Sequence, residues 1–382
     1  MPHVRVCALV ARAVVAAVPV AVLLVQPGPA GGAAIERSVP SASRILYEPG
    51  RYGEIGAAWV DPRQTGAGAD LTLLGTPAVY DGRTGDMLDP QWTLSGAVKG
   101  DLAPRLSVAV VIDQPYGAAT TYPGGASPVA ALYAGTLARL DTWEATGVVA
   151  WDVTPAVKVY GGLRAQWLDA RAEIPFIADY AVEGAGDWGV GYLVGVAYAR
   201  PEIAFRAALT YLSAIRHRLA TEETAAVGAE TSTTGISTPQ SVALEIQSGI
   251  APRTLAFGSV RWVEWSDFDI APPLYGALVG EPLVDYSGDW WTWTAGLARE
   301  LTDSLAGSLS LTYEPSLGGA LTTLGPHDGR TTVTAALSYD FGAANLTGGV
   351  TWGRLGDTAN ALDTEFDDGS VLGVGVRLGV RF

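Results

Sequence analysis

The sequence predicts an all-β protein, a transmembrane antiparallel β-barrel of about 14 strands with a short N-terminal plug segment. The first observation is the C-terminal run 370–382, in which apolar residues alternate with glycine and arginine up to Phe382. Such alternation gives one apolar face and one small or polar face. About ten residues cross a bilayer when the strand is tilted, and a terminal aromatic ring suits the membrane interface.

The second observation is composition. The chain is 48% hydrophobic and contains 47 glycines, yet only 16% of its residues are charged. After the first 34 residues it has no run of eighteen apolar residues, so no segment predicts a spanning helix. A chain of this kind satisfies its backbone in lipid by closing a sheet.

The third observation is the rhythm of connections between alternating runs. Short connections rich in Pro, Gly, Asp and Ala occur at 99–104, 152–156, 200–202, 250–253, 301–304 and 341–344. Longer polar or Pro/Gly-rich stretches occur at 61–91, 113–140, 171–185, 219–239, 266–289, 314–329 and 356–369. Short turns at one rim and long loops at the other are typical of outer-membrane barrels, and this count joins about 14 strands.

The N-terminus predicts a secretory signal peptide over 1–30. Arg5 and Arg12 precede the apolar run 13–25, and small residues follow. We expect cleavage after Ala30, with Ala34 as the alternative. Residues 31–50 then form a short periplasmic or plug segment, and residues 51–382 form the barrel in the outer membrane of a Gram-negative bacterium, in contact with lipid and lipopolysaccharide. The sole cysteine, Cys7, would leave with the signal peptide.

Charge and motifs exclude several classes of function. The net charge of -15 leaves no basic stripe for nucleic acid. Only His217 and His327 follow the predicted signal peptide, and we place one at the rim of a strand and one in a loop. The acidic stretch 363–368 lacks the glycine and the final glutamate of a calcium loop. We therefore expect no enzyme activity, no catalytic residues, no metal site and no cofactor.

Alternation also assigns side chains to faces. Arg164 and Arg206 fall at inward positions, which avoids placing a cation on the lipid face. Leu209 and Ile215 are assigned to lipid. Phe257, Arg261 and Trp265 are assigned inward in a less regular strand.

Aromatic residues gather near predicted strand ends. For Tyr116, Trp265 and Phe268 the alternatives are interfacial anchoring and a role in an apolar mouth or lumen. For the cluster 290–293 we expect interfacial anchoring.

Several phrases resemble the FadL-type outer-membrane transporters of long-chain fatty acids and other hydrophobic compounds. They are Ile45-Leu46-Tyr47-Glu48-Pro49-Gly50-Arg51-Tyr52, Asp113-Gln114-Pro115-Tyr116-Gly117, Thr238-Pro239-Gln240, the run from Ser259 to Phe268, Tyr313-Glu314-Pro315 and Leu324-Gly325-Pro326. The similarity extends over 35–382.

The resemblance implies a monomer in which a hydrophobic ligand binds in the lumen and leaves sideways beside a kinked third strand, driven by its own gradient. The third strand is expected at 105–112, with Pro115 and Gly117 at the kink or gate; a plain loop that begins at Pro115 is the alternative. The implied ligand-binding residues are Tyr116, Arg164, Arg206, Phe257, Arg261, Trp265 and Phe268, the arginines as partners for a fatty carboxylate or as lumenal ion pairs. The family's plug carries an Asn-Pro-Ala element, which this chain lacks; Glu48-Pro49-Gly50 occupies that region.

Two other functions remain open at this stage. A general diffusion porin for small hydrophilic solutes would need rings of charge at a constriction. A structural or adhesive barrel would act through its loops.

Overall fold

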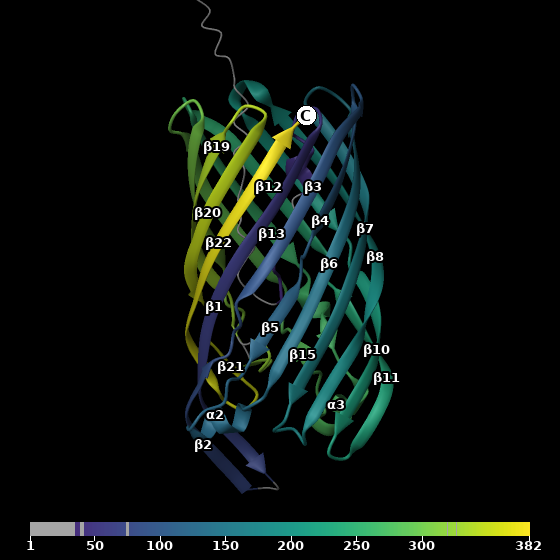
Figure 1. Ribbon diagram of the computed structural model, residues 1–382, viewed down its shortest axis with the longest axis vertical. Helices are drawn as coiled ribbons and strands as arrows, with labels where there is room; N and C mark the ends of the chain where they lie inside the picture. The colour runs from purple at the N-terminus through teal and green to yellow at the C-terminus, as the bar shows by residue number, and fades with distance from the viewer. Residues whose placement is uncertain (1–34, 39–41, 74–75, 319, 326) are drawn as a thin grey trace, which may run out of the picture.

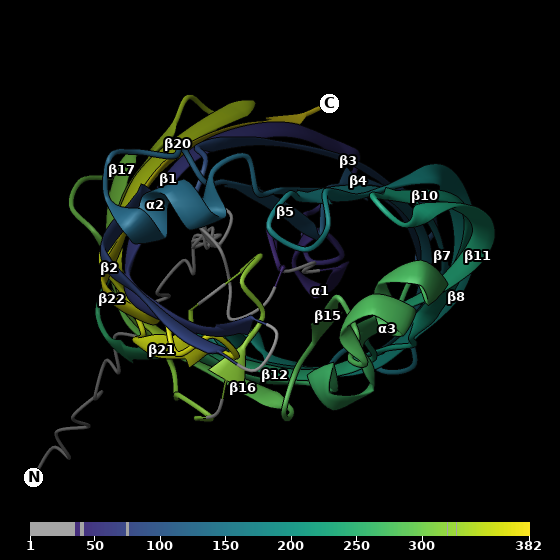
Figure 2. The same ribbon diagram turned by 90° about the horizontal axis from the view of Figure 1, so that it is seen from below.

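The computed structural model describes residues 35–38, 42–73, 76–318, 320–325 and 327–382. The predicted signal peptide and both of its cleavage sites lie outside these residues, as do parts of the predicted plug segment. Strands form a closed antiparallel barrel of 14 strands, which confirms the predicted fold class (Figures 1 and 2). Closure is made by β1 and β22, which pair from Tyr52↔Arg381 to Ala67↔Glu365.

The wall strands run in chain order around the barrel. They are β1 (Tyr52–Leu73), β3 (Gln91–Ala103), β4 (Leu106–Asp113), β6 (Leu137–Asp152), β7 (Val157–Ile174), β8 (Tyr180–Arg200), β9 (Phe205–Leu212) with its continuation β10 (Ile215–Ala225), β11 (Gly228–Thr238) with its continuation β12 (Ser241–Ala251), β13 (Thr254–Val263), β16 (Trp290–Glu300), β17 (Leu305–Glu314), β19 (Arg330–Asp340), β20 (Ala344–Leu355) and β22 (Glu365–Arg381).

The two ends of the barrel differ as the connection lengths predict. All the short predicted connections join wall strands at one end, at the top of Figure 1, which we name the short-turn end. The opposite end, the loop end, carries the additional elements. These are β2 (Thr76–Asp86), β5 (Gly117–Thr121), α2 (Pro128–Tyr133), η2 (Trp265–Asp267), β14 (Asp269–Ile270), α3 (Pro273–Val279), β15 (Val284–Asp285), β18 (Ala320–Leu321) and β21 (Thr358–Asn360), while η1 (Pro201–Ile203) lies in a short turn.

Alternation places apolar side chains outside and small or polar ones inside. Leu163 is exposed on the outer surface, whereas Arg164 beside it is buried. The same holds for Leu209 and its neighbour Ala208. Among the described residues no helix has the length and apolarity needed to span a membrane.

The face assignment of Ile215 is wrong. Inward positions are even-numbered in β9 and odd-numbered in β10, because Ser213 and Ala214 interrupt the strand and shift the alternation by one residue. Ile215 is therefore completely buried. His217 is also buried within this strand and not at a rim, since β10 continues the wall to Ala225.

The third wall strand, β4, ends at Asp113, one residue later than predicted. Beyond it the chain leaves the barrel wall. β4 pairs with β3 as far as Gly96↔Ile112, and beyond it residues 91–95 of β3 pair only with β1. After residues 114–116 the chain resumes as β5, displaced by one residue in its register with β6. We name residues 114–116 the third-strand break.

The N-terminal segment, residues 35–38 and 42–50, lies within the barrel. Its helix α1 (Ala42–Ile45) occupies the interior in Figure 2. Ile45 and Leu46 are buried against Tyr52 and other lumenal side chains. Lys99 of β3 donates to the backbone oxygen of Glu48 at 2.7 Å, which anchors the end of this segment to the wall.

Candidate functional site

An apolar cavity lies inside the loop end of the barrel. It holds about 650 Å³ of space that no atoms fill, part of it open to solvent. Its wall is contributed by β5, β6, β7, β8, β10 and β11, and its cover by the loop elements around β14, β15 and β18. The apolar lining residues include Ile35, Ala118, Ala138, Leu140, Ala170, Ala172, Val182, Leu219, Ile236, Ile270, Leu283, Val284, Tyr286 and Leu324. We name this space the lumenal cavity.

The change in side-chain character along β6 marks the floor of the lumenal cavity. The inward positions Ala138 and Leu140 line the cavity, whereas the next inward positions, Thr142 and Glu144, belong to a polar network. The cavity therefore ends where the inner face of the wall becomes polar.

An aromatic cluster closes one side of the cavity. The Trp265 ring makes edge contacts with Phe268 and Tyr286, each at a centroid distance of 5.2 Å, and with Tyr116 at 5.9 Å. Burial raises the pKa of Tyr286, so its phenol stays neutral at physiological pH. The cluster thus presents an uncharged surface to the cavity.

The N-terminal segment binds directly to the third-strand break. Arg37 N donates to Pro115 O at 2.8 Å, and Gly117 N donates to Ile35 O at 2.7 Å. These bonds form an antiparallel β-bridge between Glu36 and Tyr116 at the edge that β3 has left free. Ile35 also lines the lumenal cavity, so one segment touches both the cavity and the break.

Two ion pairs hold this segment. Glu36 accepts from Arg261 Nη1 at 2.6 and 2.7 Å, with both side chains buried. Arg37 reaches Asp141 of β6 at 2.6 Å. A Cβ atom at Gly117 would overlap the Arg37 side chain on this path, which explains why glycine suits the position.

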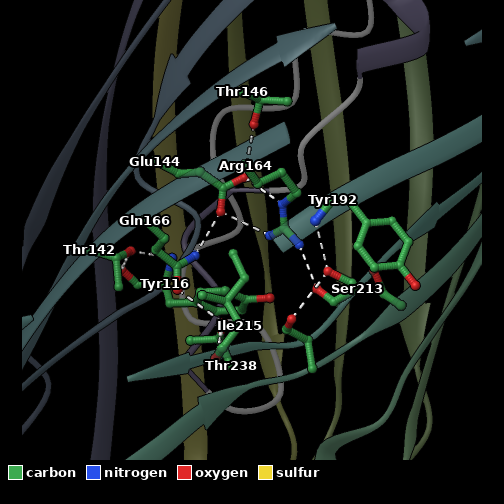
Figure 3. Close-up of polar contacts among 12 residues, drawn as sticks. Tyr116, Thr142, Glu144, Thr146, Arg164, Gln166, Tyr192, Ser213, Ile215 and Thr238 are labelled. Atoms are coloured by element: carbon green, nitrogen blue, oxygen red, sulfur yellow. Dashed lines mark hydrogen bonds and ion pairs between the residues drawn. The ribbon is translucent and has the colours of Figure 1, made fainter. Parts of the chain in front are cut away.

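A polar network spans the inner wall below the cavity (Figure 3). Arg164 donates from Nε and Nη2 to the two carboxylate oxygens of Glu144 at 2.8 and 2.9 Å, and from Nη1 to Ser213 O at 2.8 Å. Gln166 donates to Glu144 at 2.7 Å. His217 contacts the Gln166 side-chain oxygen at 3.0 Å. Arg164 therefore joins β6 and β7 to the interruption between β9 and β10.

The third-strand break is attached to the same region. The Thr142 hydroxyl accepts from Tyr116 N at 2.9 Å and donates to Tyr116 O at 2.7 Å (Figure 3). These two bonds satisfy the backbone N–H and C=O of Tyr116, which lies outside the ladders that β4 and β5 form with β6. The break is therefore held by a side chain of β6 on one edge and by the N-terminal segment on the other.

The structure brings some of the predicted site residues together and separates others. Tyr116, Trp265 and Phe268 belong to the aromatic cluster, and Pro115 and Gly117 lie at the third-strand break. Phe257 lies elsewhere, packed with Leu255 and Ala298.

The three predicted arginines all have protein partners. Arg164 pairs with Glu144, and Arg261 pairs with Glu36. Arg206 lies over the Tyr47 ring at 4.6 Å, beside helix α1. None of the three is among the residues that line the lumenal cavity.

Sequence reasoning missed several lining residues of the cavity, two arginines among them. Arg139 and Arg171 both line it, and Arg139 pairs with Asp89 at 2.6 Å. Its buried Nη1 has no hydrogen-bond partner among the described residues. Trp290, expected at the interface, is buried in the aromatic cluster, whereas Trp291 and Trp293 are exposed. Alternation along β16 already separates Trp290 from the other two.

No protein-family model matches the chain. No curated protein sequence matches it either. Among solved structures, a Pseudomonas aeruginosa FadL homologue superposes with a TM-score of 0.74 at 13% identity, covering 92% of this chain and 96% of its own. The Ralstonia pickettii toluene transporter TbuX gives a TM-score of 0.62 at 13% identity, covering 94% and 97%.

The Pseudomonas putida toluene transporter TodX gives a TM-score of 0.61 at 14% identity and covers 88% of this chain and 91% of its own. These three structures are a FadL homologue and two toluene transporters. Together with the N-terminal segment inside the barrel, these superpositions show that the protein is a barrel of the FadL-type fold.

Proposed function

We propose that this protein moves hydrophobic small molecules passively across the outer membrane of a Gram-negative bacterium. The observation that carries the proposal is the lumenal cavity, which is concave and lined mainly by apolar side chains, as small-molecule sites are. An apolar solute gains little from a water-filled pore, whereas this cavity offers it a continuous apolar surface. The FadL-type fold and the toluene transporters that share it support the same class of cargo.

Long-chain fatty acids are the cargo that we propose. The acyl chain would lie along the alanine and leucine side chains of β6 and β7, with its carboxylate near Arg139. The unpartnered Nη1 of Arg139 supplies a charge-assisted donor at the cavity wall. Arg164, Arg206 and Arg261 are better explained as structural side chains, because none of them lines the lumenal cavity and each contacts another part of the protein.

The N-terminal segment acts as the plug in this proposal. It connects Ile35 in the cavity wall to Pro115 and Gly117 at the third-strand break, so ligand that displaces Ile35 also disturbs the break. Exit then occurs sideways at the break, where residues 91–95 of β3 have no strand partner on the β4 side and Leu94 N is bonded there to the Gln114 side chain. The barrel works as a monomer surrounded by lipid and lipopolysaccharide.

Uptake by cells that lack their own transporter tests this proposal. Cells with the barrel should accumulate labelled oleate or toluene faster than cells without it, while the purified barrel conducts few ions in a planar bilayer. Steady ion conductance without uptake would favour a diffusion porin. Equal accumulation with no conductance would favour a structural or adhesive barrel.

A further inference from the structure

The barrel wall has a second discontinuity, between β8 and the β9–β10 strand. β8 pairs with β9 from Arg200↔Phe205 to Leu193↔Leu212, and with β10 from Gly184↔Thr221 onward. Between these ladders, residues 185–192 and 213–220 form no strand pairs with each other, although the register is the same on both sides. We name this stretch the β8–β10 seam.

Few polar contacts cross the β8–β10 seam among the described residues. At its short-turn end, Ser213 N donates to Tyr192 O and Tyr192 N donates to the Ser213 hydroxyl, both at 2.9 Å. Nearer the loop end, Arg218 N donates to the Asp187 carboxylate at 2.8 Å, and His217 Nδ1 lies 3.7 Å from the same carboxylate. The middle of the seam therefore lacks the hydrogen bonds that hold barrel strands together.

Apolar side chains close the seam from the inside. The Ile215 side chain packs against the β8 backbone at Gly189 and Gly191, and a Cβ at Gly191 would lie 2.6 Å from Ile215 Cγ1. A Cβ at Gly189 would lie 2.8 Å from Arg216 O, so β10 overlaps the inner surface of β8 here. The two glycines make this overlap sterically feasible. Movement of β10 away from β8 would break these apolar contacts and the few hydrogen bonds across the seam. It would also strain the bonds that tie this stretch to β7, from Arg164 to Ser213 O and between Gln166 and His217.

The seam lies between the lumenal cavity and the outer surface. Gly184, Leu219 and Thr221, at its loop end, line the cavity. On the outer surface of the same stretch, Trp188 and Val190 are exposed by 65% and 69%. At this position a layer of buried side chains, including Ile215 and Leu219, separates the cavity from the lipid-facing surface.

We propose that the β8–β10 seam is a second lateral portal, through which a hydrophobic molecule passes between the lumenal cavity and the bilayer. The inference rests on the proposed transport function. The portal is distinct from the third-strand break, which lies between β3 and β5 and involves the N-terminal segment. Opening requires Ile215 to leave its contacts with Gly189 and Gly191.

A reversible cross-link tests the portal. In Gly191→Cys/Ile215→Cys the two side chains start within disulfide reach, because a Cβ at 191 lies 2.6 Å from Ile215 Cγ1. The matched control, Val196→Cys/Leu209→Cys, joins residues that already face each other in the β8–β9 ladder. Oxidation should lower oleate uptake several-fold in the seam variant and reduction should restore it, while the control keeps the parent rate in both states.

The outcomes separate the portal from the transport function. If the parent barrel moves no hydrophobic molecule, the proposed function fails, and the portal with it. If the parent transports and the oxidised seam variant matches it, the portal alone is overturned. Mass spectrometry of the oxidised protein verifies the disulfide.

A second variant covers the case in which the disulfide does not form. Ile215→Ala removes the side chain that closes the seam, whereas Leu193→Ala removes a similarly buried, inward side chain beside the intact ladder. The portal predicts a several-fold faster uptake for Ile215→Ala and the parent rate for Leu193→Ala. Equal rates for both variants would overturn it. Resistance of the folded barrel to unfolding in cold detergent shows that each variant has folded.

Discussion

Glu36 of the N-terminal segment and Arg261 of β13 form a buried ion pair in the barrel interior. Arg261 Nη1 donates to both carboxylate oxygens of Glu36, at 2.6 and 2.7 Å, and each side chain is only 5% exposed. The pair ties the segment that lines the lumenal cavity to the opposite part of the wall. A charge buried to this degree depends on its partner.

Loss of this pair should free the N-terminal segment. Glu36→Gln leaves Arg261 buried without a counter-charge, and removal of one partner of a buried pair costs about 3–5 kcal/mol of unfolding free energy. We expect lower stability in denaturant titration and higher ion conductance in planar bilayers. Asp303→Asn is the control, because that carboxylate pairs with Arg253 while 98% exposed. Unchanged conductance in Glu36→Gln would show that the segment does not obstruct the barrel.

A side chain at Gly117 should displace Arg37. Gly117→Val places new atoms on the path of the Arg37 side chain toward Asp141. We expect the hydrogen bonds between residues 35–38 and the third-strand break to be lost, and conductance to rise as for Glu36→Gln. Gly147→Val is the control, since a Cβ there meets no atom within 4 Å. The same conductance in both glycine variants would contradict this role for Gly117.

A larger side chain in the cavity should exclude larger cargo. Ala172 is a buried lining residue of β7, whereas Ala145 on the neighbouring strand β6 is exposed. We expect Ala172→Phe to lower the uptake of oleate more than that of toluene, and Ala145→Phe to change neither. Overpacking costs about 1–3 kcal/mol, so folding is checked by heat-modifiable migration. Parent-like oleate uptake in folded Ala172→Phe would place the route outside the cavity.

Arg139 should matter for cargo that carries a carboxylate. Arg139→Gln removes the cation at the cavity wall, so fatty acid uptake should fall while toluene uptake stays at the parent rate. Arg299→Gln removes an exposed arginine at the short-turn end as a control. Equal loss for both cargoes would indicate a structural role for Arg139 instead.

Local alternation predicted much of the wall. It gave the short-turn positions, and it correctly separated inward Arg164 from outward Leu163. It failed at Ile215 because the interruption at Ser213 and Ala214 shifts the alternation by one residue, which exchanges the two faces at every following position. No local pattern marks the interruption, since Ser213 and Ala214 are ordinary strand residues.

The N-terminal segment was predictable as a plug only by resemblance. The pairing of Glu36 with Arg261 and of Ile35 with Gly117 joins distant parts of the chain, and neither partner carries a sequence signal for the other. The cavity had a detectable signal, the change along inward positions of β6 from Ala138 and Leu140 to Thr142. Sequence spacing alone does not show which loops cover it.

Photolabelling tests the central claim, that hydrophobic molecules occupy the lumenal cavity, most directly. A long-chain fatty acid that carries a diazirine is added to membranes containing the barrel, and the sample is irradiated. Mass spectrometry then identifies the labelled peptides. We predict labelled peptides from 118–140, 170–184, 219–236 and 270–286, with labelling suppressed by excess oleate and reduced in Ala172→Phe. Label confined to lipid-facing positions, unaffected by oleate, would contradict the account.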